Sequence, residues 1–229
     1  MREFISTYPY FVGSAAYSAV VVVLALTTLR AAQARLTLWS GVLGVPTFIY
    51  LGYFERVYWH PRRIGGLSLG FEDALLSFML AATTWYLAAL VFGGRLQVEV
   101  RYQTALRRAA ILSVVGGLLF LPVAESGVDP MTALLLTYLI LTPLLWWQNR
   151  WAWRLVAIGI PALALTWLAA LRFFFWVHPE AVLVWNPQGP WGTLIAGVPR
   201  GELVWAAGYG GLWPLVTAYV YDVRWRPGA

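Results

Sequence analysis

The chain has 229 residues, of which 60% are hydrophobic, 16% aromatic and only 11% charged. Soluble domains carry about 25% charged residues, so this composition indicates an integral membrane protein and excludes a disordered chain or a coiled coil. The net charge of +6 comes from scattered basic residues, whereas nucleic-acid binding needs a continuous basic surface. All 16 basic residues are Arg and Cys is absent, which excludes disulfides, thiolate ligands and lysine imine chemistry.

Seven apolar segments are long enough to cross a hydrocarbon core about 30 Å thick, a distance that takes about 20 helical residues. In chain order they cover residues 10–30, 36–54, 68–93, 106–122, 131–148, 152–174 and 196–220. The sequence therefore predicts an all-α integral membrane protein with seven transmembrane helices, in a single membrane domain that takes in residues 1–229.

The arginines are distributed unequally between the two sides of the predicted helices. Ten flank one side, namely Arg30, Arg35, Arg95, Arg101, Arg107, Arg108, Arg150, Arg154, Arg224 and Arg226. Six flank the other, namely Arg2, Arg56, Arg62, Arg63, Arg172 and Arg200. Because basic residues collect on the cytoplasmic side, we expect a plasma-membrane protein with its N-terminus outside and its C-terminus in the cytoplasm.

Two connections on the predicted outer side, residues 55–67 and 175–195, resemble each other. Each has a Trp-x-Pro segment, then a Gly-containing stretch, then an acidic helix start. The first copy reads Tyr58-Trp59-His60-Pro61 and Gly70-Phe71-Glu72-Asp73, and the second reads Val184-Trp185-Asn186-Pro187 and Pro199-Arg200-Gly201-Glu202. Trp59 and Trp185 are 126 residues apart, and Asp73 and Glu202 are 129 apart. We therefore expect two parallel three-helix repeats, 10–93 and 131–222, joined by a linker helix over 106–122.

A parallel repeat would place Glu72, Asp73 and Glu202 at the same depth, around one central apolar pocket. Two interpretations of these acids stay open. They can be first-turn acids that the helix dipole stabilises, paired with an arginine such as Arg63 or Arg200. Alternatively they are functional, because a carboxyl that is desolvated in an apolar helix tends to stay protonated and can act as a general acid. Recurrence in both copies of the repeat favours the functional interpretation.

Aromatic and small residues add further expectations. Trp85, Trp167 and Trp205 lie within predicted spans and are candidates to wall a pocket, where an aromatic face would attract a cation. The glycines at 116–117 and 208–211 predict close helix packing. His60 and His178 lie in loops without a third ligand at helical spacing, so we expect no metal site.

The repeated Trp-x-Pro segment, Gly-containing spacer and acidic helix start resemble the cofactor-independent lycopene cyclase domain family. In that family the helix start reads Pro-x-Glu-Glu/Asp, and each half is a three-span module, found as separate subunits or fused. The resemblance covers residues 10–93 and 131–222 and implies that both modules are fused in this chain. The chain departs from the pattern at Gly70, where Pro is expected, and at Gly201, where the first acid is expected.

The resemblance implies a membrane carotenoid cyclase that forms end rings without a cofactor. A carboxylic acid would start a non-redox carbocation cyclisation, with Glu72 or Asp73 as proton donor and Glu202 as its partner. The side chains implied to line the substrate site are Trp59, Pro61, Trp85, Trp185, Pro187, Pro199 and Trp205. The implied partners are a linear carotenoid or another polyisoprenoid and the lipid bilayer, with no nucleic acid. Whether the chain forms a homo-oligomer stays open.

Three alternatives remain from the residues. A carotenoid-end hydratase would use the same acid but admit water to the cation. A seven-helix proton-coupled transporter of small molecules would use the carboxyls as a relay. A non-catalytic carotenoid-binding protein would keep the apolar cavity without depending on the acids. Product mass separates cyclase from hydratase, and amide substitutions of the acids separate an enzyme from a binder.

Overall fold

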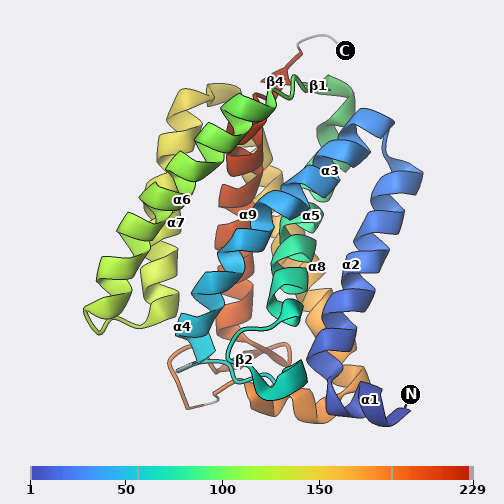
Figure 1. Ribbon diagram of the computed structural model, residues 1–229, viewed down its shortest axis with the longest axis vertical. Helices are drawn as coiled ribbons and strands as arrows, with labels where there is room; N and C mark the ends of the chain where they lie inside the picture. Colours follow the sequence, from blue (N-terminus) through green and yellow to red (C-terminus); the bar gives the residue numbers. More distant parts are fainter. Residues whose placement is uncertain (1, 56, 187, 227–229) are drawn as a thin grey trace.

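The computed structural model describes residues 2–55, 57–186 and 188–226 and is mostly helical (Figure 1). Arg56 and Pro187, both singled out by the sequence, lie outside these residues. Six helical segments of the described chain are long and apolar enough to cross a membrane, namely Pro9–Thr28, Ala31–Glu55, Phe71–Arg95, Tyr102–Glu125, Pro130–Gln148 and Arg150–Val177. The expected all-α membrane class is therefore confirmed.

The helices follow one another with short connections. The α-helices are α1 (Arg2–Thr7), α2 (Pro9–Thr28), α3 (Ala31–Gly44), α4 (Leu51–Glu55), α5 (Phe71–Phe92), α6 (Tyr102–Glu125), α7 (Pro130–Gln148), α8 (Trp153–Val177) and α9 (Arg200–Val220). Short 3-10 helices are η1 (Val45–Tyr50), η2 (Ile64–Gly66), η3 (Gly93–Arg95), η4 (Arg150–Ala152) and η5 (Pro179–Val184). Strand β1 (Leu96–Gln97) pairs antiparallel with β4 (Arg224–Trp225), and β2 (Leu194–Ile195) with β3 (Val198–Pro199).

Helix α9 lies in the centre of the bundle, with α6 and α7 on one side of it and α3 and α5 on the other (Figure 1). It packs along α8 and also contacts α7 and α5. Thirteen of its residues are buried. It falls outside the six most apolar helices because Gly, Trp and Tyr replace aliphatic residues along it. Helix α1 and strand β4, the first and last elements of the described chain, lie at opposite ends of the bundle (Figure 1).

Local sequence explains where several helices begin and change. Proline occupies the first turn of α2 and α7, where its missing N–H costs nothing. Asp129 caps α7 by accepting hydrogen bonds from the backbone N–H groups of Met131 and Thr132 at 3.0 and 3.1 Å. Helix α3 ends at Gly44 and η1 begins at Val45, directly before Pro46, which lacks the N–H that would continue the α-helical pattern.

Glycines bring α8 and α9 into backbone contact. A Cβ atom built on Gly159 would overlap the carbonyl oxygen of Gly210, and one built on Gly210 would overlap that of Gly159. Close packing by the glycines of 208–211 is thus confirmed at Gly210. The same expectation is wrong for Gly116, because no atom lies within 4 Å of a Cβ built there.

The two Trp-x-Pro segments meet at the end of the bundle that holds the N-terminus. Trp59 and Trp185 form an isolated antiparallel bridge. The backbone N–H of His60 donates to the carbonyl of Val184 at 2.9 Å, and that of Asn186 donates to the carbonyl of Tyr58 at 2.9 Å. His60 and Asn186 are 126 residues apart, and so are Tyr58 and Val184. The same hydrogen bond is therefore made in both directions between the two segments.

We expect Gly159→Ala and Gly210→Ala each to destabilise the protein by about 1–3 kcal/mol, because the added methyl group forces apart two backbones in contact. Thermal unfolding in detergent measures this as a lower midpoint. Gly116→Ala is the matched control, since its methyl group meets open space and a helical Gly→Ala change stabilises by up to about 1 kcal/mol. Equal midpoints for all three variants would contradict the prediction.

Candidate functional site

A cavity of about 650 Å³ lies in the middle of the bundle, with walls from α2, α3, α5, α6, α7, α8 and α9. Most of its lining is aliphatic or aromatic. Glu202 is the one carboxyl group among the described residues that line it. Aromatic side chains around the same end of the cavity are Tyr10, Tyr58, Trp59, Trp167, Trp185 and Trp205. The cavity therefore combines one acid with a largely apolar, aromatic wall.

Glu202 lies in the first turn of α9 and is held by two indoles. The Nε1 group of Trp167 donates to Glu202 Oε2 at 2.9 Å, and that of Trp185 donates to Oε1 at 2.9 Å. Within the described chain no arginine forms an ion pair with it. The pairing considered with Arg200 is absent there, because Arg200 donates to the carbonyl of Pro190 and lies over the Trp191 ring. The carboxyl is thus positioned by neutral donors alone.

Tyr58 explains the glycine that precedes Glu202. A Cβ built on Gly201 would lie 2.6 Å from the Tyr58 hydroxyl oxygen and 2.9 Å from Trp191 Cβ. The hydroxyl is buried beside Glu202 but outside hydrogen-bond geometry with any described group. Burial raises the pKa of Tyr58 far above its usual value. Tyr58 therefore stays protonated, and Gly201 is the residue that lets it approach.

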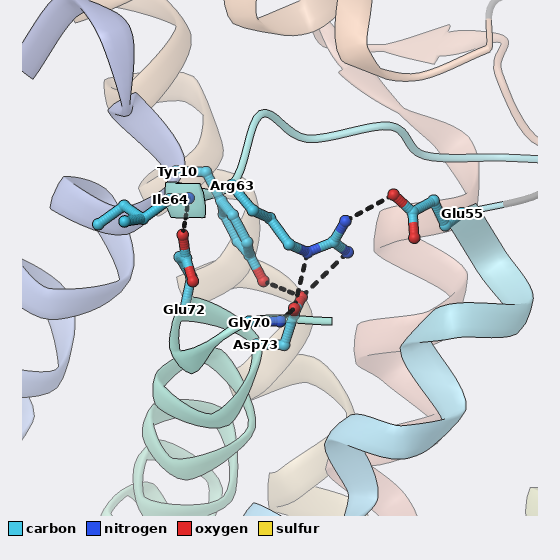
Figure 2. Close-up of polar contacts among 7 residues, drawn as sticks. All are labelled: Tyr10, Glu55, Arg63, Ile64, Gly70, Glu72 and Asp73. Carbon is cyan, nitrogen blue, oxygen red and sulfur yellow. Dashed lines mark hydrogen bonds and ion pairs between the residues drawn. The ribbon is translucent and has the colours of Figure 1, made fainter. Parts of the chain in front are cut away.

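Asp73 is part of a buried charged network near the start of α5 (Figure 2). Arg63 donates through Nε to Asp73 Oδ2 at 2.7 Å and through Nη2 to Oδ1 at 3.2 Å. Its Nη1 donates to Glu55 Oε1 at 2.7 Å. The Tyr10 hydroxyl and the Gly70 N–H also donate to Asp73, at 2.8 and 2.7 Å. Asp73 is 0% exposed and Arg63 3%, so this carboxylate is fully paired.

Glu72 is also held in place by contacts with the loop before α5. Its Oε1 accepts a hydrogen bond from the backbone N–H of Ile64 at 2.6 Å (Figure 2). Its Oε2 lies so close to Gly70 that a Cβ there would overlap it, and proline at this position would also lack the N–H that Gly70 donates to Asp73. Neither Glu72 nor Asp73 lines the cavity. The structure therefore does not bring the three acids into one pocket, because Arg63 and the backbone of its loop hold two of them outside.

The remaining expected site residues divide into two groups. Trp59, Trp185 and Trp205 line the cavity, and so does Trp167. The others do not: Trp85 is wholly buried in the core, Pro61 lines a smaller pocket beside Arg62, and Pro199 is buried in β3. Pro187 lies outside the described residues.

Two cavity residues on α9 escaped the sequence analysis. Tyr209 and Trp213 line the cavity and continue a column that Trp205 begins. Ring centroids are 5.4 Å apart between Trp205 and Tyr209, and 5.1 Å apart between Tyr209 and Trp213, with planes inclined by 30° and 6°. The spacing of four residues was the available signal, since it places side chains on one helix face. The neighbouring glycines drew attention to packing instead.

The charged network and the cavity are connected through aromatic rings. The Arg63 guanidinium lies 5.5 Å from the centre of the Trp59 ring, and Tyr10 meets the same ring edge-on at 4.9 Å. Trp59 in turn lies 6.2 Å from Trp185. Because Trp185 donates to Glu202, the Asp73 network supports the wall that positions the cavity's acid.

Comparisons of the chain with protein-family models, with curated proteins and with solved structures found no match.

Asp73→Asn keeps the side-chain size but leaves the buried Arg63 with Glu55 as its remaining ionic partner. Removing one member of a buried pair costs about 3–5 kcal/mol, so we expect a large drop in unfolding midpoint in detergent. Glu55→Gln is the matched control, because the Glu55 side chain is 27% exposed whereas that of Asp73 is fully buried, so solvent can partly replace the lost interaction and we expect a smaller loss. A control that destabilises as much as Asp73→Asn would contradict a central role for Asp73.

Proposed function

We propose that the protein is a membrane-embedded cyclase of linear carotenoids or related polyisoprenoids, and that Glu202 is its acid. The observation that carries the proposal is the placement of a single carboxyl, without an ionic partner among the described residues, in a large apolar cavity with aromatic walls. An unpaired charge is costly in such surroundings, so the cavity favours the acid form of this group. A protonated carboxyl beside an apolar binding space is suited to protonating an alkene.

The proposed chemistry needs no redox change and no cofactor. Glu202 gives its proton to the terminal double bond, whose π electrons form the new C–H bond and leave a tertiary cation. A neighbouring double bond attacks that cation and closes the ring through a new C–C bond. The ring cation then loses a proton to the Glu202 carboxylate, which restores the acid. Substrate and product are isomers, and every proton is accounted for.

The contacts of Glu202 suit both the donation of its proton to the substrate and the later recovery of a proton from the ring cation. The indole N–H groups of Trp167 and Trp185 can stabilise the carboxylate that remains after proton transfer, as positioned donors do for developing negative charge. The carboxylate lies in the same cavity as the cation and stabilises it electrostatically. Apolar walls exclude water, which would otherwise trap the cation as an alcohol. Glu72 and Asp73 are not assigned as donors, because their contacts hold them outside the cavity.

We also propose the finer topology that this family likeness implies, with α9 as a seventh span and α6 as a linker between two three-helix repeats. Equivalent contacts support it: α3 packs on α5 as α8 packs on α9, and α2 packs on α5 as α7 packs on α9. The reciprocal bridge of Trp59 and Trp185 supports it too. The excess of arginines at the end that holds the C-terminus favours a cytoplasmic C-terminus and an outer N-terminus.

Co-expression with a lycopene-producing pathway tests the activity. We expect chromatography to show new pigments with the mass of lycopene, because ring closure is an isomerisation. A product heavier by one water would identify a hydratase instead. Unchanged lycopene, with the protein folded in the membrane, would overturn the enzyme proposal in favour of a transporter or a binding protein.

Glu202→Gln removes the transferable proton and keeps one of the two indole contacts, because the amide oxygen accepts from an indole N–H whereas the amide nitrogen only donates. General acid catalysis contributes about 10²- to 10⁴-fold, so we expect ring formation to fall by at least about a hundredfold in the same pigment assay. Glu180→Gln is the matched control, because Glu180 is an exposed acid of η5 that does not line the cavity. Full activity of Glu202→Gln would remove Glu202 from the mechanism.

A further inference from the structure

The cavity extends well beyond the acid. Its lining residues on α9 run from Glu202, in the first turn, to Val220, the last residue of the helix. At a rise of about 1.5 Å per residue, these 18 steps cover about 27 Å, on the order of the hydrocarbon thickness of a bilayer. Protonation and ring closure involve only one end of a substrate. The remaining length therefore needs a different explanation.

Stacked aromatic side chains of α9 form the wall along this part of the cavity. Trp205, Tyr209 and Trp213 cover one another's faces and all three line the cavity. Ring edges carry the positive part of the aromatic quadrupole. The complementary surface is the π face of a flat, conjugated chain, which presents negative density along its whole length.

The cavity reaches the surface between η1 and α6. Ile49 of η1 lines the cavity and is 53% exposed. Ser113 of α6 also lines it and is exposed, and beside Gly116 there is open space. An apolar chain can therefore pass from the cavity to the lipid-facing surface at this place.

We propose that the α9 column is a binding track for the unreacted part of a linear conjugated hydrocarbon. The reacting end lies at Glu202, the chain extends along Trp205, Tyr209 and Trp213, and the opening between η1 and α6 connects the cavity with the lipid. This inference rests on the proposed function for the reacting end, and it adds that one end is handled in each binding event. The second end of a symmetric substrate reacts only after the chain has left and re-entered.

Gly116→Trp tests the track by filling it. Gly116 lines the cavity and a Cβ built there meets no atom within 4 Å, so we expect the indole to occupy part of the cavity. Leu118→Trp is the matched control on the same helix, since Leu118 is 69% exposed and does not line the cavity. Both are made in the Glu202→Gln background, and bound lycopene is measured by absorption of the purified protein. We expect at least a tenfold loss of bound lycopene for Gly116→Trp and none for Leu118→Trp.

Tyr209 supplies an independent test of what the track recognises. It is 6% exposed, and its hydroxyl has no hydrogen-bond partner among the described residues. If the ring edge binds a hydrocarbon, Tyr209→Phe keeps lycopene binding, whereas Tyr209→Leu lowers it at least about threefold, the range of one aromatic contact. An equal loss in both variants would overturn the hydrocarbon track, because the hydroxyl would then hold a polar group.

The outcomes separate the track from the proposed reaction, because binding is measured without turnover. Lycopene bound at the parent level by Gly116→Trp, or lost equally from Leu118→Trp, overturns the track while leaving the role of Glu202 untouched. Selective loss from Gly116→Trp, together with unchanged lycopene in the pathway assay, supports the track and overturns the cyclase.

Discussion

The reciprocal backbone pairing of Trp59 with Trp185 is the constraint on which the rest of the structure depends. It joins two loops that are far apart in the sequence and fixes both indoles at one end of the cavity. On one side, Trp59 receives the guanidinium of Arg63 and the ring of Tyr10. On the other, Trp185 donates to Glu202. The position of the cavity's acid thus follows from a contact between the two halves of the chain.

Hydropathy and spacing predicted much of the fold and part of the site. The seven apolar runs all coincide with long helices of the described chain, six of which are apolar enough to cross a membrane, and the offset of 126 identified two segments that pair in the structure. Helix α9 is harder to recognise by hydropathy, because the Gly, Trp and Tyr residues that build its packing surface and its aromatic column dilute its apolar character. The residues that let this helix pack in the centre of the bundle are the ones that lower its mean hydropathy.

The acids could not be distinguished by their place in the repeated motif. Asp73 and Glu202 each lie in the first turn of a long helix, but Arg63 pairs with the first, and the position 126 residues further on is Gly189. The first half therefore holds a paired carboxylate, while the second presents an acid to the cavity. Sequence alone offered Arg63 as one partner among several, and only the path of the loop shows which side chain it reaches. Gly201 is likewise explained by Tyr58 from the other half.

The contact between Gly159 and Gly210 has a mechanical consequence. At Gly159 and Gly210 the backbones of α8 and α9 touch and cannot move closer, so we expect these two helices to move as one unit. Helix α6 is the opposite case, with only Ala105, Gly117 and Phe120 buried among its described residues. If the cavity widens to admit a large ligand, we therefore expect α6 to be the helix that moves. The fluidity of the surrounding lipid then determines how easily α6 moves.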